Sequence, residues 1–211
     1  MPANTAKQVL VSTGRTLMRS MLTTLMLRTP LRDQSWQQSL FKQFSCDGRF
    51  GSVALDLGSG PQPRNPFACE QATGIDFKAS EQVMACDLST EAIPLDDGAV
   101  GVITAFDFLE HVPRLLPSPA GGTRYPFVEM MNEIHRVLQP RGLFFSSTPC
   151  HPWPMAYSDP THVNIMTEET LSHYFCQPRT WAKIYGFTGT FELVDHGWIG
   201  GHHNALLRKL N

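Results

Sequence analysis

Four side chains that could take up a proton stand in two short polar segments of the sequence: His111, His162, Asp107 and Asp159. Histidine titrates near neutral pH, so a neutral imidazole can accept a proton from a hydroxyl group under physiological conditions. A nearby carboxylate can orient the imidazole or act as the base itself. These residues are therefore candidates for a catalytic step, although many loop histidines and aspartates only orient their neighbours.

A glycine-rich turn marks a second candidate site. The segment DLGSGP at residues 56–61 directly follows an apolar run. Its two glycines allow a tight turn and let a ligand approach the backbone closely. Dinucleotide-binding turns follow the pattern G-x-G-x-x-G, in which the third glycine makes room beside a pyrophosphate. That third position is Pro63 here, which favours an adenosyl ligand without a pyrophosphate, or an ordinary glycine turn.

Two acidic residues further along the chain are suited to the rest of such a ligand. Asp76 comes twenty positions after Asp56, at the end of the next apolar run, where a carboxylate can accept hydrogen bonds from both hydroxyls of a ribose. Asp87 could accept a hydrogen bond from an adenine amino group while Leu88 contacts the flat base. As a single residue, Asp87 could equally belong to a turn.

The elements that must position these residues alternate between short apolar runs and helical stretches, which is typical of a mostly parallel sheet. Apolar residues at three- and four-residue spacings predict a helix over residues 125–138, ended by Pro140 and Gly142. The expected fold is a Rossmann-like, doubly wound α/β fold with seven strands, closed by an antiparallel C-terminal hairpin. The predicted strands cover residues 53–57, 73–76, 82–86, 100–105, 142–146, 191–196 and 204–209.

These segments together resemble the class I S-adenosylmethionine-dependent methyltransferases, especially the small type 11 group. The resemblance spans roughly residues 50–210 and is carried by LDLGSGP at 55–61, GID at 74–76, DL at 87–88, FLEHV at 108–112 and EIHRVL at 133–138. A proline-rich start of the first helix departs from the family pattern. A looser similarity, around residues 58–67 and 159–163, is to bacterial members associated with polysaccharide building.

The resemblance implies that S-adenosylmethionine is the cofactor and that the glycine turn, the second-strand acid and the Asp-Leu pair bind it. The expected cofactor-binding residues are Asp56, Gly58, Ser59, Gly60, Asp76, Phe77, Asp87, Leu88 and Phe106. Relatives that methylate nucleobase nitrogens resemble one another in an Asn/Asp-Pro-Pro-Tyr run, where this chain has Phe106-Asp-Phe-Leu. Methyl transfer to an oxygen of a small molecule or glycan precursor is therefore favoured. The alternatives are N-, carboxyl- or C-methylation of another metabolite, or a non-catalytic cofactor-binding subunit.

The first fifty residues differ from the remainder of the chain. They hold seven Lys and Arg residues against two Asp, whereas the whole chain has a net charge of -2. Apolar residues between positions 9 and 26 recur at helical spacings, up to Thr29-Pro30. We expect residues 1–50 to form a helical cap or lid and residues 51–211 to form the methyltransferase domain. A membrane-surface helix and a transit peptide are the alternatives.

Composition narrows the remaining possibilities. The five cysteines show no C-x-x-C spacing, and the histidines show no H-x-x-x-H or zinc-type spacing. Reduced cysteines, a cytoplasmic location and no metal are expected. The near-neutral net charge predicts no nucleic-acid partner. No apolar run has the length of a membrane-spanning helix, so any membrane contact would be peripheral, through the N-terminal helix.

Overall fold

The computed structural model describes residues 27–46 and 51–210. The chain divides into two units, Met1–Pro30 and Leu31–Asn211, and all elements named below belong to the second. The amphipathic helix expected before Thr29 falls outside the described residues, so the cap or lid stays a prediction. None of the helices in the described part of the chain combines the length and apolar character needed to span a bilayer.

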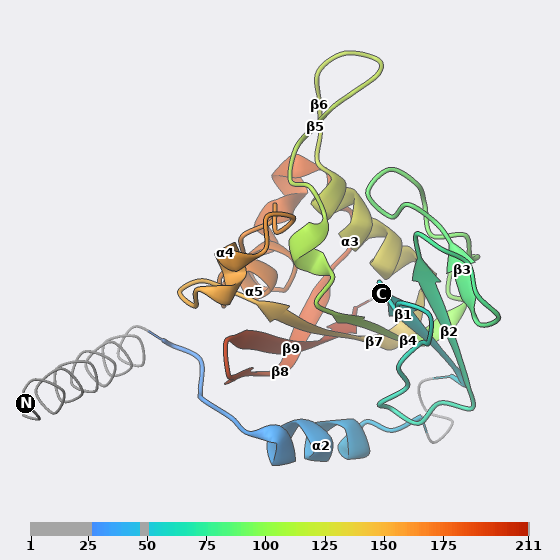
Figure 1. Cartoon of the computed structure of the whole chain (residues 1–211), viewed down its shortest axis with the longest axis vertical. Coiled ribbons are helices and arrows are strands. Elements are labelled where there is room, and N and C mark those ends of the chain that lie inside the picture. The colour runs from blue at the N-terminus through green and yellow to red at the C-terminus, as the bar shows by residue number, and fades with distance from the viewer. Residues whose placement is uncertain (1–26, 47–50, 211) are drawn as a thin grey trace, which may run out of the picture. The chain divides into compact units, whose positions relative to one another are not determined.

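A seven-stranded sheet forms the centre of the second unit (Figure 1). The strand order is β3-β2-β1-β4-β7-β9-β8. The first five are parallel neighbours, and β9 pairs antiparallel with both β7 and β8. Their bounds are β1 Val53–Leu57, β2 Gln71–Asp76, β3 Val83–Ala85, β4 Val100–Phe106, β7 Leu138–Pro149, β8 Phe191–Ile199 and β9 His202–Lys209. The predicted fold class is confirmed, including the C-terminal hairpin.

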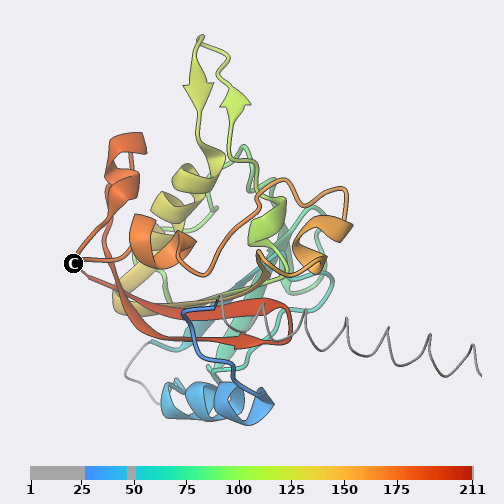
Figure 2. The ribbon, with the colours of Figure 1, turned by 90° about the vertical axis from the view of Figure 1, so that its left-hand side faces the viewer.

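Helices cover the two faces of this sheet (Figure 2). On one face lies α2 (Gln34–Gln43), and on the other lie α3 (Pro126–Val137) and α5 (Thr170–Tyr174). The predicted stripe of α3 is buried, and the helix ends at Val137, three residues before Pro140, because proline disfavours helical backbone in the residue before it. The short helix α4 spans Met155–Ser158, η1 Leu109–His111 and η2 Trp181–Tyr185, while β5 (Leu116–Pro117) and β6 (Thr123–Arg124) form a separate hairpin.

The connection from β1 to β2 differs from the expected helix. Residues 58–70 form turns and loop in the structure, without a helix. Pro61, Pro63 and Pro66 lie within this segment. Each proline lacks a backbone N–H donor and restricts the residue before it, so the three together prevent a hydrogen-bonded helix.

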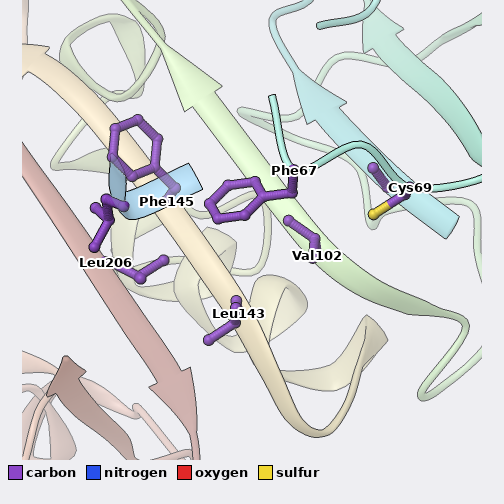
Figure 3. Packing of buried hydrophobic residues seen from close by; sticks show 8 residues of the cluster. Phe67, Cys69, Val102, Leu143, Phe145 and Leu206 are labelled. Atoms are coloured by element: carbon purple, nitrogen blue, oxygen red, sulfur yellow. The ribbon is translucent and has the colours of Figure 1, made fainter. Parts of the chain in front are cut away.

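The core between α2 and the sheet is aromatic and aliphatic (Figure 3). Leu40 of α2 packs with Phe67, Val102, Phe145 and Leu206, all almost fully buried. Beside this cluster, Cys46 and Cys69 form a disulfide. The expectation of five reduced cysteines is therefore wrong for this pair. The cysteines consequently give no support for a reducing compartment. The two cysteines are 23 residues apart in the sequence and meet because α2 packs beside the β1–β2 loop.

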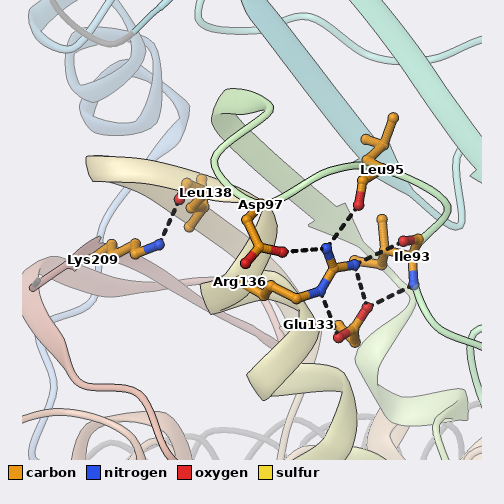
Figure 4. A network of polar contacts seen from close by, with 7 residues as sticks. All are labelled: Ile93, Leu95, Asp97, Glu133, Arg136, Leu138 and Lys209. Carbon is orange, nitrogen blue, oxygen red and sulfur yellow. Dashed lines mark hydrogen bonds and ion pairs between the residues drawn. The ribbon is translucent and has the colours of Figure 1, made fainter.

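An arginine-centred network fixes the loop between β3 and β4 (Figure 4). Arg136 of α3 binds Glu133 and Asp97 and donates to the carbonyl oxygens of Ile93 and Leu95 at 2.9 and 2.8 Å. These hydrogen bonds hold the pKa of Glu133 below its usual range and raise that of Arg136. The last turn of α3 thus anchors the chain just before β4.

Candidate functional site

A cavity of about 260 Å³ lies at the carboxyl ends of the parallel strands. The strand order reverses between β1 and β4, and ligands of open α/β sheets bind in the crevice at such a point. Among its lining residues are Gly58 after β1, Asp76 at the end of β2, Leu88 after β3, and Asp107 and His111 after β4. The three segments expected to hold an adenosyl ligand therefore converge on one cavity.

Gly58 lines this cavity and has a backbone conformation that requires glycine. Its φ is +63°, a backbone conformation in which side chains are strained, and a Cβ at this position would lie 2.5 Å from the Phe108 ring. The aromatic ring of Phe108 itself lines the cavity. A glycine is thus required both by the turn and by the ring packed against it, which explains the glycine that the sequence pattern singled out.

The carboxylate of Asp76 is held in place by the glycine turn. One oxygen accepts a hydrogen bond from the backbone N–H of Gly60 at 2.9 Å, and the other accepts from the N–H of Phe77 at 2.7 Å. A carboxylate has about four lone-pair positions, so both oxygens keep capacity for further donors. Asp76 can therefore receive two hydroxyl groups of a ligand in a fixed orientation.

Other predicted cofactor residues take different positions. Within the described part of the chain, the cavity lining includes Phe77 but not Asp56, Ser59, Gly60, Asp87 or Phe106. Asp56 is buried beneath the turn, where its oxygens accept from Thr104 Oγ1 at 2.7 Å and from the N–H of Arg64 at 2.8 Å. Burial raises its pKa. Asp56 thus fixes the loop, and this role is structural rather than a cavity contact.

Two further predicted cofactor-binding residues, Asp87 and Phe106, make contacts outside the cavity. The side chain of Asp87 accepts from the N–H of Ser89 at 3.0 Å and from Thr90 Oγ1 at 3.1 Å, as in an ordinary aspartate turn. The Phe106 ring packs against Phe145, with the rings 5.4 Å apart. Leu88 remains the apolar contact of this segment because it is buried and lines the cavity.

The four candidate proton acceptors lie together beside this cavity. The rings of His111 and His162 are 4.9 Å apart. The hydroxyl of Thr161 donates to Asp159 at 2.6 Å and lies 3.0 Å from His111 Nδ1. Since the only hydroxyl hydrogen goes to Asp159, His111 must donate its Nδ1 hydrogen to Thr161. The Nε2 atom of His111 then carries an available lone pair.

Asp107 occupies the tip of β4 in a strained conformation, with φ at +51°. One of its oxygens lies 2.7 Å from His202 Nε2 of β9. This hydrogen bond holds the pKa of Asp107 below its usual range and raises the pKa of His202. Asp107 is therefore ionised and fixed beside His111 in the cavity wall.

Three residues that were not among the predicted site residues complete this region: Glu110, Arg114 and Asn164. The backbone N–H of Asn164 donates to the Glu110 carbonyl at 2.9 Å, and its side chain donates to the Leu109 carbonyl at 2.9 Å. Arg114 in turn donates to the Asn164 side chain at 2.7 Å. This fully buried asparagine fastens the segment containing His162 to η1. Glu110 is itself buried, and burial raises its pKa to about 7.

A second cavity, of about 480 Å³, begins next to η1. Arg114 and Leu115 line it together with aromatic residues of the helical side: Tyr125, Phe127, Tyr174, Phe175 and Tyr185. Within the described chain, Trp153, Tyr157 and Trp181 do not line this cavity; Trp153 packs near Trp198 instead.

The same fold occurs in solved methyltransferase structures. An S-adenosylmethionine-dependent methyltransferase from Aquifex aeolicus matches 86% of this chain and 91% of its own length, with 14% identity and a TM-score of 0.52. The chain has the class I methyltransferase fold. The [4+2]-cyclase SpnF matches 92% of this chain and 93% of its own, with 15% identity and a TM-score of 0.54.

A third match comes from the complex between the Haloferax volcanii Trm112 methyltransferase activator and a methyltransferase. It covers 87% of this chain and 86% of its own, with 11% identity and a TM-score of 0.51. No protein-family model and no curated protein sequence matches the chain. At these identities the likeness carries the fold, and function has to be argued from the site.

Proposed function

We propose that this chain is an enzyme that binds S-adenosylmethionine and transfers its methyl group to an oxygen atom of a small molecule or glycan precursor. The observation that supports this most directly is the convergence of Gly58, Asp76 and Leu88 on one cavity whose wall also contains His111. The first three residues suit an adenosyl group, and the histidine suits a reacting hydroxyl.

Several cavity residues have a proposed role in binding the cofactor. Asp76 accepts hydrogen bonds from the ribose hydroxyls, Leu88 and the exposed Phe77 ring contact the adenine, and the backbone beside Gly58 borders the methionine part. The protein's main task is to align the sulfonium methyl with the acceptor and exclude water.

The transfer itself is an in-line displacement. A lone pair of the acceptor oxygen forms the new O–CH₃ bond while the S–CH₃ bond breaks and its electron pair stays on sulfur. The acceptor hydroxyl must lose its proton, and we place that step at the cluster of Asp107, His111, Asp159 and His162. His111 is the histidine of this cluster that lines the cavity, and its hydrogen bond to Thr161 leaves the Nε2 lone pair available.

The second cavity is our candidate binding site for the methyl acceptor, and its lining favours a substrate that carries oxygen. The second cavity starts three residues after His111 and is lined by three tyrosines, and aromatic walls with polar edges suit sugars and other hydroxylated rings. A nitrogen, carboxylate or carbon acceptor remains the alternative, as does a cofactor-binding subunit without turnover. The cytoplasmic location and the peripheral membrane contact proposed for the N-terminal segment stay predictions.

Titration calorimetry with S-adenosylmethionine and its demethylated product tests cofactor binding. We expect binding by the full chain and at least about tenfold weaker binding by Asp76→Asn, because hydrogen bonds to a charged group contribute about 1.5–3 kcal/mol each. Asp96→Asn, which changes an exposed aspartate outside the cavity lining, is the matched control. A folded protein with no affinity for either compound would refute the proposal.

Methyl transfer is tested separately by release of the demethylated cofactor over a panel of hydroxylated acceptors, including sugar nucleotides, with amine and carboxylate compounds as the contrasting set. Turnover with hydroxylated acceptors supports oxygen transfer. Turnover only with amines or carboxylates supports the alternative acceptors, and binding without turnover on any acceptor supports the non-catalytic subunit.

A further inference from the structure

Glu110, His111 and His162 form a compact group of potential metal ligands. Each offers one ligand atom, and these atoms lie within 4.8 Å of one another. Glu110 and His111 come from η1, whereas His162 comes from the segment after α4, about fifty residues later. Spacing along the sequence could not reveal this group, which is why the sequence predicted no metal.

The state of Glu110 points to a missing ligand. Its side chain is 1% exposed, and neither carboxylate oxygen has a hydrogen-bond partner among the described residues. The nearest ring nitrogen, His162 Nε2, is 4.0 Å from Oε1, too far for a hydrogen bond. Buried carboxylates normally accept several hydrogen bonds or bind a metal, so an orphaned one beside two imidazoles is unusual.

The ring of His111 is oriented for metal binding, whereas buried His162 Nδ1 has no hydrogen-bond partner among the described residues. His111 donates its Nδ1 hydrogen to Thr161, which in turn donates to Asp159. A hydrogen bond of this kind fixes the tautomer and orientation of a metal-binding histidine and leaves Nε2 unprotonated. The backbone segment that carries His162 is fastened to η1 by two hydrogen bonds from Asn164, to the carbonyl oxygens of Glu110 and Leu109.

We propose that Glu110, His111 and His162 bind one divalent transition-metal ion beside the cofactor cavity. Two imidazole nitrogens and one carboxylate oxygen suit Zn²⁺, Co²⁺, Fe²⁺ or Mn²⁺, whereas Mg²⁺ and Ca²⁺ prefer oxygen ligands alone. Two ligand atoms of one tetrahedral zinc ion are about 3.4 Å apart, so side-chain movements of about 1.5 Å would complete the group. Three protein ligands leave a position open for a substrate atom.

The role of the ion, unlike its binding, rests on the proposed function. An ion at this group would lie next to His111 in the cavity wall and would lower the pKa of an acceptor hydroxyl that it contacts. With the ion bound, His111 Nε2 would be a metal ligand in place of a proton acceptor, so the hydroxyl proton would leave to water and the oxygen lone pair would attack the sulfonium methyl. The cluster would thereby select acceptors with an oxygen able to coordinate the ion.

The test uses the full chain without an affinity tag, stripped of metal by a chelator. Co²⁺ is the probe because its visible absorption reports nitrogen and oxygen ligation, and elemental analysis gives the stoichiometry. We expect one Co²⁺ per chain, displaced by Zn²⁺, and at least tenfold weaker binding in both Glu110→Gln and His162→Asn. Thermal unfolding of each variant shows that it is folded.

A surface pair supplies the control. His173 and Glu169 lie 3.7 Å apart near the protein surface, and His173→Asn should leave Co²⁺ binding unchanged. Binding that is absent, or equally strong in folded Glu110→Gln and His162→Asn, overturns the metal site. The cofactor titration is run on the same stripped protein. Cofactor binding without Co²⁺ binding overturns only the metal site, and the reverse result overturns only the proposed function.

Discussion

Two clusters of charged side chains lie at opposite ends of β4 and are built in opposite ways. Before the strand, Arg136 is surrounded by two carboxylates and two carbonyl oxygens, and its side chain is saturated with hydrogen bonds (Figure 4). After the strand, Glu110 is more deeply buried and has no hydrogen-bond partner among the described residues.

The difference separates a structural cluster from a functional one. A charged group with all its hydrogen bonds formed stabilises the fold, because each hydrogen bond to water lost on folding is replaced by one within the protein. An unsaturated buried carboxylate costs stability, and such groups are found where a ligand is to be bound. We therefore expect substitutions in the Arg136 cluster to change stability and substitutions in the Glu110 cluster to change activity.

The largest effect is expected from His111→Ala. Turnover should fall about 100-fold or more, which is the usual contribution of a group that assists proton transfer, while cofactor affinity and the melting temperature stay close to those of the parent chain. Release of demethylated cofactor and calorimetry measure the two quantities. His173→Ala, at a distant histidine, is the control. An unchanged turnover number would remove His111 from the reaction.

The reverse pattern is expected from Arg136→Met. The free energy of unfolding should fall by about 2 kcal/mol, because Glu133 and two carbonyl oxygens lose their charged donor. Urea denaturation measures it, and cofactor affinity should stay unchanged. Asp97→Asn is the matched variant. Since the Asp97 side chain is 81% exposed, its ion pair should contribute well under about 1 kcal/mol. Equal losses in both variants would contradict the idea of a saturated anchor.

A different kind of buried titratable group is found on β9, where His202 and His203 are neighbours. His202 pairs with Asp107, but His203 is buried and its pKa is lowered to about 3. Below pH 6.5, His203 binds a proton in the unfolded chain but stays neutral in the folded chain. The free energy of unfolding is therefore highest above pH 6.5 and falls as the pH drops toward 3. The loss between pH 7 and pH 5 should be about 2 kcal/mol.

Urea denaturation at several pH values measures this loss. His203→Gln removes the titrating group and should flatten the dependence between pH 5 and pH 7, whatever its effect on stability at pH 7. A variant with the same slope as the parent chain would show that other groups cause the acid sensitivity.

The smallest effect is expected for the stability of Glu110→Gln in metal-free protein. The amide has the shape of the carboxyl group without its charge, so the free energy of unfolding at pH 8 should stay the same or rise by up to about 1 kcal/mol. Glu133→Gln, at the saturated carboxylate, should lower it. If both variants lose stability equally, Glu110 belongs to the structural class and the contrast between the clusters disappears.

The sequence by itself determined the sheet, helix α3 and the glycine turn. Strand and helix periodicities are local, and the stripe of α3 and the strand β1 (Val53–Leu57) lie where the pattern predicted them. Asp76 and Leu88 could also be placed at the site from the sequence, because the carboxyl ends of neighbouring parallel strands meet at one edge of a sheet.

Only the tertiary structure decided which distant residues meet. The contact of His111 with Thr161, the grouping of Glu110 with His162 and the disulfide between Cys46 and Cys69 all involve segments far apart in the chain. No local periodicity encodes such contacts, since they depend on how loops are fastened after the sheet has formed. The structure also distinguished the roles of two aspartates. Asp56 is buried under the turn and supports it, whereas Asp76 lines the cavity.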